Sequence, residues 1–268
     1  MKEILTTFAV EESQCTPSSY SMPRIRDTVE CMLEYVLARL PEAREMLQHY
    51  SSLDPMKITS TEILAELSWV VYSSGFRYDV VKKYWRAISH AFRGFEITEV
   101  ASLYDDVESQ ARRICLDCGF NNLRKAMWCI QNAHRIVELD FEKRSLGGLA
   151  GYMRGLSRMN TYDLIRLAPS LVEELRFKGI GSTTILHLMK NLGIDVFKPD
   201  IHVRRTLAKL RLTYEVDAPT ADICRAMFLL SHASEMRMSA LDTLLFEYGR
   251  ITGDALVPEV RAVISDVV

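Results

Sequence analysis

The sequence contains no long apolar run, since no stretch approaches the roughly 18 to 20 consecutive apolar residues that a membrane span needs. Its six cysteines are scattered, which favours free thiols in a reducing cytosol over a disulfide framework. The N-terminal segment is short and carries acidic residues, so it does not resemble a secretory signal. From these absences we expect a cytoplasmic protein that makes no membrane contact.

Signals for β-strands are missing as well, because the chain shows no convincing period-two alternation, no internal repeat and no low-complexity stretch. Helical spacing is present nearly everywhere. Thr59 and Glu62 have the spacing of a capping box, and residues 119–122 form a turn between two helical patterns. Gly249 is expected to cap a helix over residues 239–248. We therefore predict an all-α protein, and its 268 residues suffice for one large domain or two small ones.

A strong charge of either sign is absent overall, because the net charge is −2. This balance argues mildly against a nucleic-acid partner, but the distribution of charge matters more than the total. Residues 176–211 contain eight basic and two acidic residues, which leaves this segment with a net charge of +6. Two interpretations stay open: a surface that faces an anion, and an ordinary solvated helix face.

The most informative segment is residues 175–184, which read L-R-F-K-G-I-G-S-T-T. Gly179 and Gly181 lie between two helical patterns, and glycine lets the backbone take positive φ and approach a ligand closely. The next helix begins just after the second glycine, and the free N–H groups of a helix N-terminus bind phosphate oxygens. Many tight helical turns look like this and bind nothing, so the turn alone does not establish DNA binding.

An acidic residue follows this turn within the basic segment. Pro199 blocks a helix before it, and Asp200 falls at the start of the next helix. Such an aspartate is commonly an N-cap that contributes about 1 kcal/mol. The functional alternative is a carboxylate that stabilises a sugar cation, or activates water, while an N-glycosidic bond breaks. A carboxylate in a basic segment fits that chemistry better than it fits passive DNA binding.

The combination of F-K-G-I-G-S-T-T with the later K-P-D-I-H-V-R-R resembles the helix–hairpin–helix DNA glycosylases, the superfamily that contains endonuclease III and the adenine-mismatch glycosylases. Residues 67–77 are similar to the helix and turn that this family presses into DNA, and residues 244–250 are similar to its closing helix. The resemblance covers residues 60–252, whereas residues 1–59 match only as generic helices.

The resemblance implies two helical domains, one formed by residues 62–193 and the other by residues 1–61 together with 194–268, with a cleft between them. Asp200 would lie at their seam, where a nucleotide flipped out of the duplex can enter. We expect a monomer that acts on double-stranded DNA containing a modified base. The implied DNA-binding residues are Lys178, Gly179, Ile180, Gly181, Ser182 and Arg204, and the implied wedge that fills the gap in the duplex is Gly75, Phe76 and Arg77.

Two departures from the family pattern define the expected chemistry. Bifunctional members have a lysine where this chain has Thr183, and that lysine forms the Schiff base that leads to strand cleavage. Threonine has no amine, so Thr183 and Asp200 predict base removal by water without efficient lyase activity. No cysteine follows Arg250, whereas an iron–sulfur cluster needs four thiolates, so we expect no cofactor. The excised base, and a role in repair or in defence against modified foreign DNA, stay open.

Other motifs have weaker interpretations. Cys115, Cys118, Cys129 and His134 have a zinc-like outline, but the last two share no helix face, and buried free cysteine is common, so we expect no metal. The aromatic residues that are candidates to line a base pocket are more often core residues, namely Trp69, Tyr72, Trp85 and Trp128. The competing functions are a helix–hairpin–helix module that binds DNA without catalysis, and a helical scaffold with no nucleic-acid partner.

Overall fold

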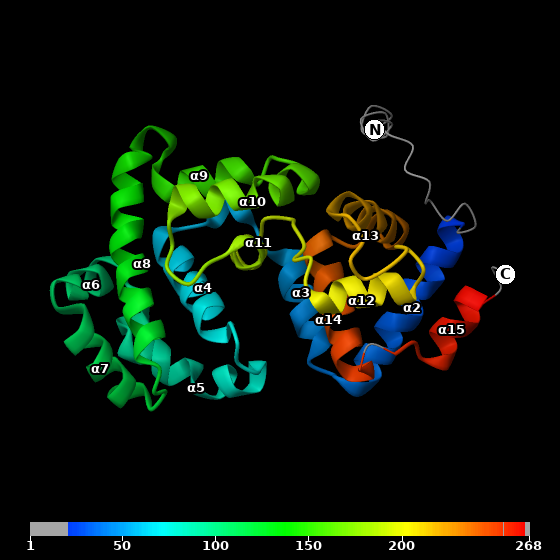
Figure 1. Cartoon of the computed structure of the whole chain (residues 1–268), viewed down its shortest axis with the longest axis horizontal. Coiled ribbons are helices and arrows are strands. Elements are labelled where there is room, and N and C mark those ends of the chain that lie inside the picture. Colours follow the sequence, from blue (N-terminus) through cyan, green and yellow to red (C-terminus); the bar gives the residue numbers. More distant parts are fainter. Residues whose placement is uncertain (1–20, 254, 266–268) are drawn as a thin grey trace. The chain divides into compact units, whose positions relative to one another are not determined.

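The structure is a computed structural model that describes residues 21–253 and 255–265. Every regular element in these ranges is an α-helix or a short 3-10 helix, and no residue in them belongs to a strand. The predicted all-α class is therefore confirmed. None of the helices within these ranges is both long and apolar enough to cross a membrane. Helices carry the labels of Figure 1.

The chain divides into two compact units, which are described separately below. Unit 1 comprises Met1–Arg44, Pro199–Met236 and Leu241–Val268. Unit 2 comprises Glu45–Lys198 and Arg237–Ala240. The first unit is thus assembled from chain segments on both sides of the second. The predicted domain bounds, at residues 61/62 and 193/194, stay a prediction.

Unit 1 is built around a long N-terminal helix, α2, which packs against α13 and α15, while α12 packs against α13. Its core is mostly aliphatic with the buried ring of Tyr248, and Val29, Met32 and Val36 of α2 are almost completely buried. Gly249 was expected to end α14, which is wrong because the helix continues for another turn and Gly253 follows it with φ of +60°. The helices are α2 (Met22–Arg39), α12 (Ile201–Lys209), α13 (Thr220–Ser234), α15 (Pro258–Ser265) and most of α14 (Met238–Thr252).

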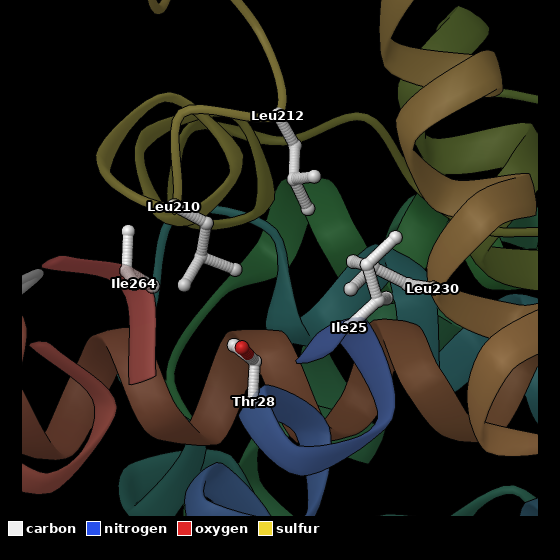
Figure 2. A pocket seen from close by; sticks show the side chains of 6 residues that line it. All are labelled: Ile25, Thr28, Leu210, Leu212, Leu230 and Ile264. Atoms are coloured by element: carbon white, nitrogen blue, oxygen red, sulfur yellow. The ribbon is translucent and has the colours of Figure 1, made fainter. Parts of the chain in front are cut away.

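A small pocket opens among the apolar side chains of unit 1 (Figure 2). Its volume is about 10 Å³, which is room for about one water molecule. The hydroxyl of Thr28 in its lining donates to the carbonyl of Arg24 at 2.8 Å, so this polar group is satisfied within its own helix. The pocket is a packing defect and has no room for a nucleobase. The lining residues are Ile25, Thr28, Leu210, Leu212, Leu230 and Ile264.

Unit 2 is organised around α8, which packs against α4, α6, α7 and α9 (Figure 1). The capping box predicted at Thr59 and Glu62 is confirmed, since each residue bonds the backbone N–H of the other. The predicted turn at residues 119–122 is also confirmed, with Gly119 at φ of +68° after α7 and Asn122 capping α8.

The helices of unit 2 fall into three groups along the chain. The first group is α3 (Ala43–Ser52, beginning in unit 1), η1 (Pro55–Lys57), α4 (Ser60–Ser73) and α5 (Tyr78–Ala91). The second group is η2 (Arg93–Phe95), α6 (Ile97–Ala101), η3 (Ser102–Asp106), α7 (Val107–Cys118) and α8 (Leu123–Glu142). The third group is η4 (Arg144–Leu146), α9 (Gly148–Leu156), α10 (Thr161–Leu175) and α11 (Ser182–Asn191).

Candidate nucleic-acid interface

The glycine-containing turn joins α10 to α11, and residues 176–181 are called the hairpin from here on. Arg176 ends α10 in the left-handed conformation with φ of +56°. Phe177 is buried and anchors the hairpin in the core, whereas Lys178, Gly179 and Gly181 are exposed. The sequence prediction of a tight turn between two helices is therefore confirmed. Its exposed side contains residues that the family resemblance implies as DNA-binding, and that role stays a prediction.

Helix α8 holds the backbone of the hairpin and of the end of α10 through two polar side chains. Asn132 is 1% exposed, and its amide accepts from the N–H of Lys178 at 2.6 Å and donates to the carbonyl of the same residue at 3.1 Å. Arg135 donates to the carbonyls of Leu175 at 3.1 Å and Glu174 at 3.4 Å, which satisfies the end of α10. The hairpin is therefore fixed by bonds to its main chain, not only by packing.

The two glycines of the hairpin differ in whether a side chain would fit at their positions. Gly179 has φ of +77°, and a Cβ atom there would lie 2.6 Å from Cε3 of Trp128, so no side chain fits. Gly181 has φ of −120°, and its Cβ would lie 4.0 Å from the nearest atom, the hydroxyl of Thr184. Gly179 is needed by the fold, whereas Gly181 leaves open space next to the start of α11.

The beginning of α11 is exposed at Ser182 and Thr183. The first N–H groups of a helix have no acceptor inside the helix, and the helix dipole adds partial positive charge there. Thr184 turns inward instead, since its hydroxyl accepts from the N–H of Gly181 at 2.6 Å and donates to the carbonyl of Gly181 at 2.9 Å. With the exposed Lys178 beside it, this end of α11 is chemically suited to bind an anion.

The predicted wedge residues lie in the connection between α4 and α5, which is called loop 74–77. Gly75 has φ of +76°, Phe76 is 41% exposed, and Arg77 is exposed at the start of α5. The Phe76 ring rests edge-on against Phe120, with 5.2 Å between centroids. An aromatic ring that is supported from beneath and open above is suited to contact a base, while the assignment of any one residue as the wedge stays a prediction.

Loop 74–77 is fixed to α8 by a buried lysine. The ammonium of Lys125 donates to the carbonyls of Val71, Tyr72 and Ser74 at the end of α4, with distances of 3.2 Å to Tyr72 and 2.6 Å to Ser74. It also lies 5.0 Å from the centre of the Phe76 ring. Burial lowers the pKa of Lys125. The charge is tolerated there because carbonyls of the last helical turn surround it.

One stripe of α8 thus holds both loops, and this α8 stripe comprises Lys125, Trp128, Asn132 and Arg135. These residues are three, four and three positions apart, so they share one face of the helix. At 1.5 Å per residue, Lys125 and Asn132 are about 10 Å apart along the axis. Loop 74–77 and the hairpin are therefore neighbours on one rigid support. Sequence reasoning missed this support, because only the contacts show which polar residues of a helix face inward.

A second brace joins the two helices that carry these loops. Asn191 of α11 donates to the carboxyl of Glu66 on α4 at 2.9 Å, and Tyr50 of α3 donates to the carbonyl oxygen of the same amide at 3.1 Å. Burial raises the pKa of Glu66 to about 7 despite the bond from Asn191, and the nearby Glu62 adds to the rise. The helices are therefore tied through a carboxyl that titrates near neutral pH.

Asp200 lies in unit 1 and caps α12. Its Oδ1 accepts from the N–H groups of His202 at 3.0 Å and Val203 at 3.1 Å, so the predicted helix start is confirmed. The side chain is half-buried. Arg204, predicted to contact DNA, donates to the carbonyls of Pro199 at 3.1 Å and Ala218 at 3.0 Å, so it also braces the chain around α12. Its DNA contact stays a prediction, as do the catalytic roles of Asp200 and Thr183.

The remaining sequence candidates have mostly structural surroundings. Burial raises the pKa of Cys115 and Cys118 and raises that of Cys129 to about 12, so the three thiols stay protonated at neutral pH. His134 stacks on Tyr104, with 4.0 Å between centroids. In the part of the chain that the structure describes, no three His, Cys, Asp or Glu residues are grouped as metal ligands would be.

Three of the four aromatic residues singled out in the sequence are partly exposed, whereas Tyr72 is fully buried. Trp69 and Trp85 meet edge-to-face, with 4.9 Å between centroids, and Trp128 supports the hairpin. His187 lies among basic groups, and burial lowers its pKa, assisted by Lys198 and Lys190. It therefore stays neutral at physiological pH.

No protein-family model, curated protein or solved structure matches the chain.

Proposed function

We propose that the protein is a monofunctional DNA glycosylase, which hydrolyses the N-glycosidic bond of a modified base and leaves an abasic site. The observation that carries the proposal is the pair of loops held by the α8 stripe. The hairpin presents a helix N-terminus with a lysine, which suits a phosphate. Loop 74–77 presents an aromatic ring about 10 Å along the same helix, which suits a base step. In this proposal, both features contact the same DNA duplex.

Asp200 is the proposed catalytic group. As the bond between C1′ and the base nitrogen breaks, the sugar gains positive charge, and a fixed carboxylate stabilises that charge. Water then adds to C1′, where its oxygen keeps one proton as the new hydroxyl, and its other proton passes to the nitrogen of the departing base. Pro199 and the bonds from His202 and Val203 hold the carboxylate in one orientation. Thr183 offers no amine for a Schiff base, so the sugar–phosphate strand stays intact.

A second candidate function has its own observation. The two N–H bonds accepted by Asp200 are those of an ordinary N-cap, which accounts for an acid at this position without any chemistry. The protein would then be a helix–hairpin–helix module that binds the DNA backbone only. The two candidates make opposite predictions about abasic sites.

A panel of modified duplexes tests the proposal. Duplexes with oxidised, alkylated, deaminated, mismatched or enlarged bases are incubated with the protein and then treated with alkali, which cleaves the strand at abasic sites. We expect alkali-dependent cleavage for at least one base class. Cleavage without alkali would contradict the interpretation of Thr183, and intact strands throughout the panel would leave the binding module as the better account.

A salt titration separates both candidates from a scaffold with no nucleic-acid partner. The affinity of a phosphate-binding protein for DNA falls steeply as salt rises. The substitution Lys178→Ala removes one exposed cation from the hairpin, so we expect weaker DNA binding and a shallower salt dependence, by about one unit of slope. The matched control is Lys57→Ala, which removes an exposed lysine from η1.

A further inference from the structure

Helix α5 carries a second basic segment, separate from the one at residues 176–211. Residues 77–93 contain five arginines and lysines and a single acidic residue, Asp79, which leaves a net charge of +4 in a chain whose total is −2. In the described part of the chain, Lys82, Lys83 and Arg86 form no salt bridge, and Asp79 pairs with Arg77 at 3.8 Å. Arg93 pairs with Glu99 at 3.4 Å, so among the described residues Lys82, Lys83 and Arg86 are the cations of this segment whose charge no neighbouring carboxylate neutralises.

The exposed face of α5 interleaves these cations with aromatic rings. Tyr78, Lys82 and Arg86 are four positions apart and exposed, so they form one ridge, while Val81 and Ile88 bury the opposite face. Trp85 lies at the edge of the ridge and is half-buried.

The aromatic rings on this face support one another. The ring of Trp69 on α4 meets Tyr78 at 5.7 Å and Trp85 at 4.9 Å between centroids, edge-to-face in both cases. The ammonium of Lys82 lies 5.5 Å from the centre of the Tyr78 ring. The surface formed by Trp69, Tyr78, Lys82, Trp85 and Arg86 is called the α5 platform, and its α4 and α5 residues lie on the two sides of loop 74–77 along the chain.

We propose that the α5 platform binds a single-stranded stretch of nucleic acid. Partly exposed aromatic rings stack on bases, and neighbouring cations contact the phosphates, which is the combination that single strands require. Paired bases are stacked on one another, so the rings favour unpaired bases over a duplex. The positive charge of residues 77–93 suits phosphates, and the aromatic rings favour a ligand with bases over an acidic peptide. The proposal rests on the proposed function in one respect: the strand is joined to the duplex that loop 74–77 contacts.

Fluorescence anisotropy with an oligothymidylate strand of about twelve nucleotides tests the platform in the full chain. The triple variant Tyr78→Ala, Lys82→Ala, Arg86→Ala should lose at least about 10-fold in affinity for this strand. Its salt slope should fall by about 1.4, because two phosphate contacts are lost. The matched control is Tyr104→Ala, Arg112→Ala, Arg113→Ala, which removes one exposed tyrosine and two exposed arginines elsewhere in unit 2. An equal loss in the control would overturn the proposal.

Two further readouts keep the test decisive. The variant Lys82→Glu, Arg86→Glu retains the Tyr78 contact with Trp69, so a loss of binding in this variant does not depend on altered aromatic packing. In a Trp128→Phe background only Trp69 and Trp85 remain, since the chain has three tryptophans, and stacked bases should quench their fluorescence. Binding of the strand without quenching would contradict the platform. Tighter binding of polyglutamate or of anionic lipid vesicles would overturn the choice of ligand.

The failure of this proposal differs from the failure of the proposed function. If the triple variant binds the single strand as the parent protein does, the platform is wrong, whether or not modified duplexes yield abasic sites. If no duplex ever yields abasic sites but the triple variant loses the single strand, the platform stands and the glycosylase proposal fails. A duplex with a single-stranded tail should bind the parent more tightly than a blunt duplex, and the triple variant should remove that difference.

Discussion

The hairpin and loop 74–77 are fixed to the same helix by different chemistry. The hairpin is held by a neutral amide, Asn132, which bonds both the N–H and the carbonyl of Lys178. Loop 74–77 is held by a buried cation, Lys125, which collects carbonyls at the end of α4. The first arrangement leaves backbone N–H groups at the start of α11 facing outward. The second leaves an aromatic side chain, Phe76, facing outward.

Under the proposed function, this difference would separate two kinds of contact with DNA. Backbone groups recognise phosphates, which position a protein on the duplex but carry no information about the base. An exposed ring instead contacts or displaces bases. The hairpin should therefore determine affinity, and loop 74–77 should determine how easily a base leaves the stack. Substitutions in the two regions should have separable effects.

The largest effect is expected for Gly179→Val. The new side chain would need positive φ and would collide with Trp128, so we expect the free energy of unfolding to fall by about 3 to 4 kcal/mol, with loss of DNA binding. Urea unfolding measures the first and anisotropy the second. The control Gly181→Ala has φ of −120° and open space, so its free energy of unfolding should fall by no more than about 1 kcal/mol, the cost of alanine at an N-cap. Equal destabilisation by both substitutions would contradict the packing of the hairpin on Trp128.

The next effect concerns the brace between α4 and α11. Folded Glu66 keeps its proton up to about pH 7, whereas the unfolded chain releases it near pH 4.5. Protonated Glu66 therefore adds to the free energy of unfolding. This contribution is fully present below pH 4.5 and is lost as the pH rises through 7, a change of up to about 3 kcal/mol. Glu66→Gln should flatten this decline and be the more stable protein at pH 8.

The measurement is urea unfolding between pH 4 and pH 8. The control is Glu45→Gln, which replaces an exposed glutamate of α3. If the pH profile of Glu66→Gln follows that of the parent, then Glu66 is not the titrating group in this range.

A smaller effect is expected for Lys125→Met. The substitution removes the ammonium that bonds three carbonyls, and we expect a loss of about 2 kcal/mol of stability because these groups lose their partner. The control Lys57→Met makes the same replacement at an exposed site and should be nearly neutral. The excision rate should fall further than the DNA affinity, since only loop 74–77 is disturbed. A larger fall in DNA affinity than in excision rate would contradict the separate roles of the hairpin and loop 74–77.

The smallest effect on stability is expected for Phe76→Ala, below about 1 kcal/mol, because the ring is 41% exposed and only partly packed. Excision from a fully paired duplex should nevertheless slow by about 10-fold, whereas excision of a mismatched base should slow less, since such a base is easier to extrude. Phe141→Ala removes a more exposed ring from α8 and serves as the control. Equal slowing on paired and mismatched substrates would argue against a wedge.

Local signals in the sequence predicted much of this architecture. The capping box at Thr59, the turn at Gly119 and the start of α12 at Asp200 follow from side-chain chemistry within a few residues, and all three are confirmed. Gly249 misled the prediction because a glycine near a helix end is not always the last residue, and here Gly253 takes the positive φ.

Local sequence signals could not predict the α8 stripe that holds the two loops. Asn132 and Lys125 look like ordinary polar residues of a helix, and only tertiary packing makes them a clamp for two loops that are distant in sequence. The α5 platform is different, since its cations and aromatic rings are visible in residues 77–93. The sequence alone did not predict the packing that leaves Tyr78 and Lys82 on one exposed ridge.

The substitution Asp200→Asn tests the central claim most directly. Asparagine caps a helix as well as aspartate does, so α12 and the fold should be unchanged while the negative charge is lost. Single-turnover excision on the preferred modified duplex should fall by at least about 100-fold, with DNA affinity unchanged or higher. The control is Asp54→Asn, which makes the same change at the cap of η1 and should leave excision intact. Undiminished excision by the Asp200→Asn protein would contradict the account.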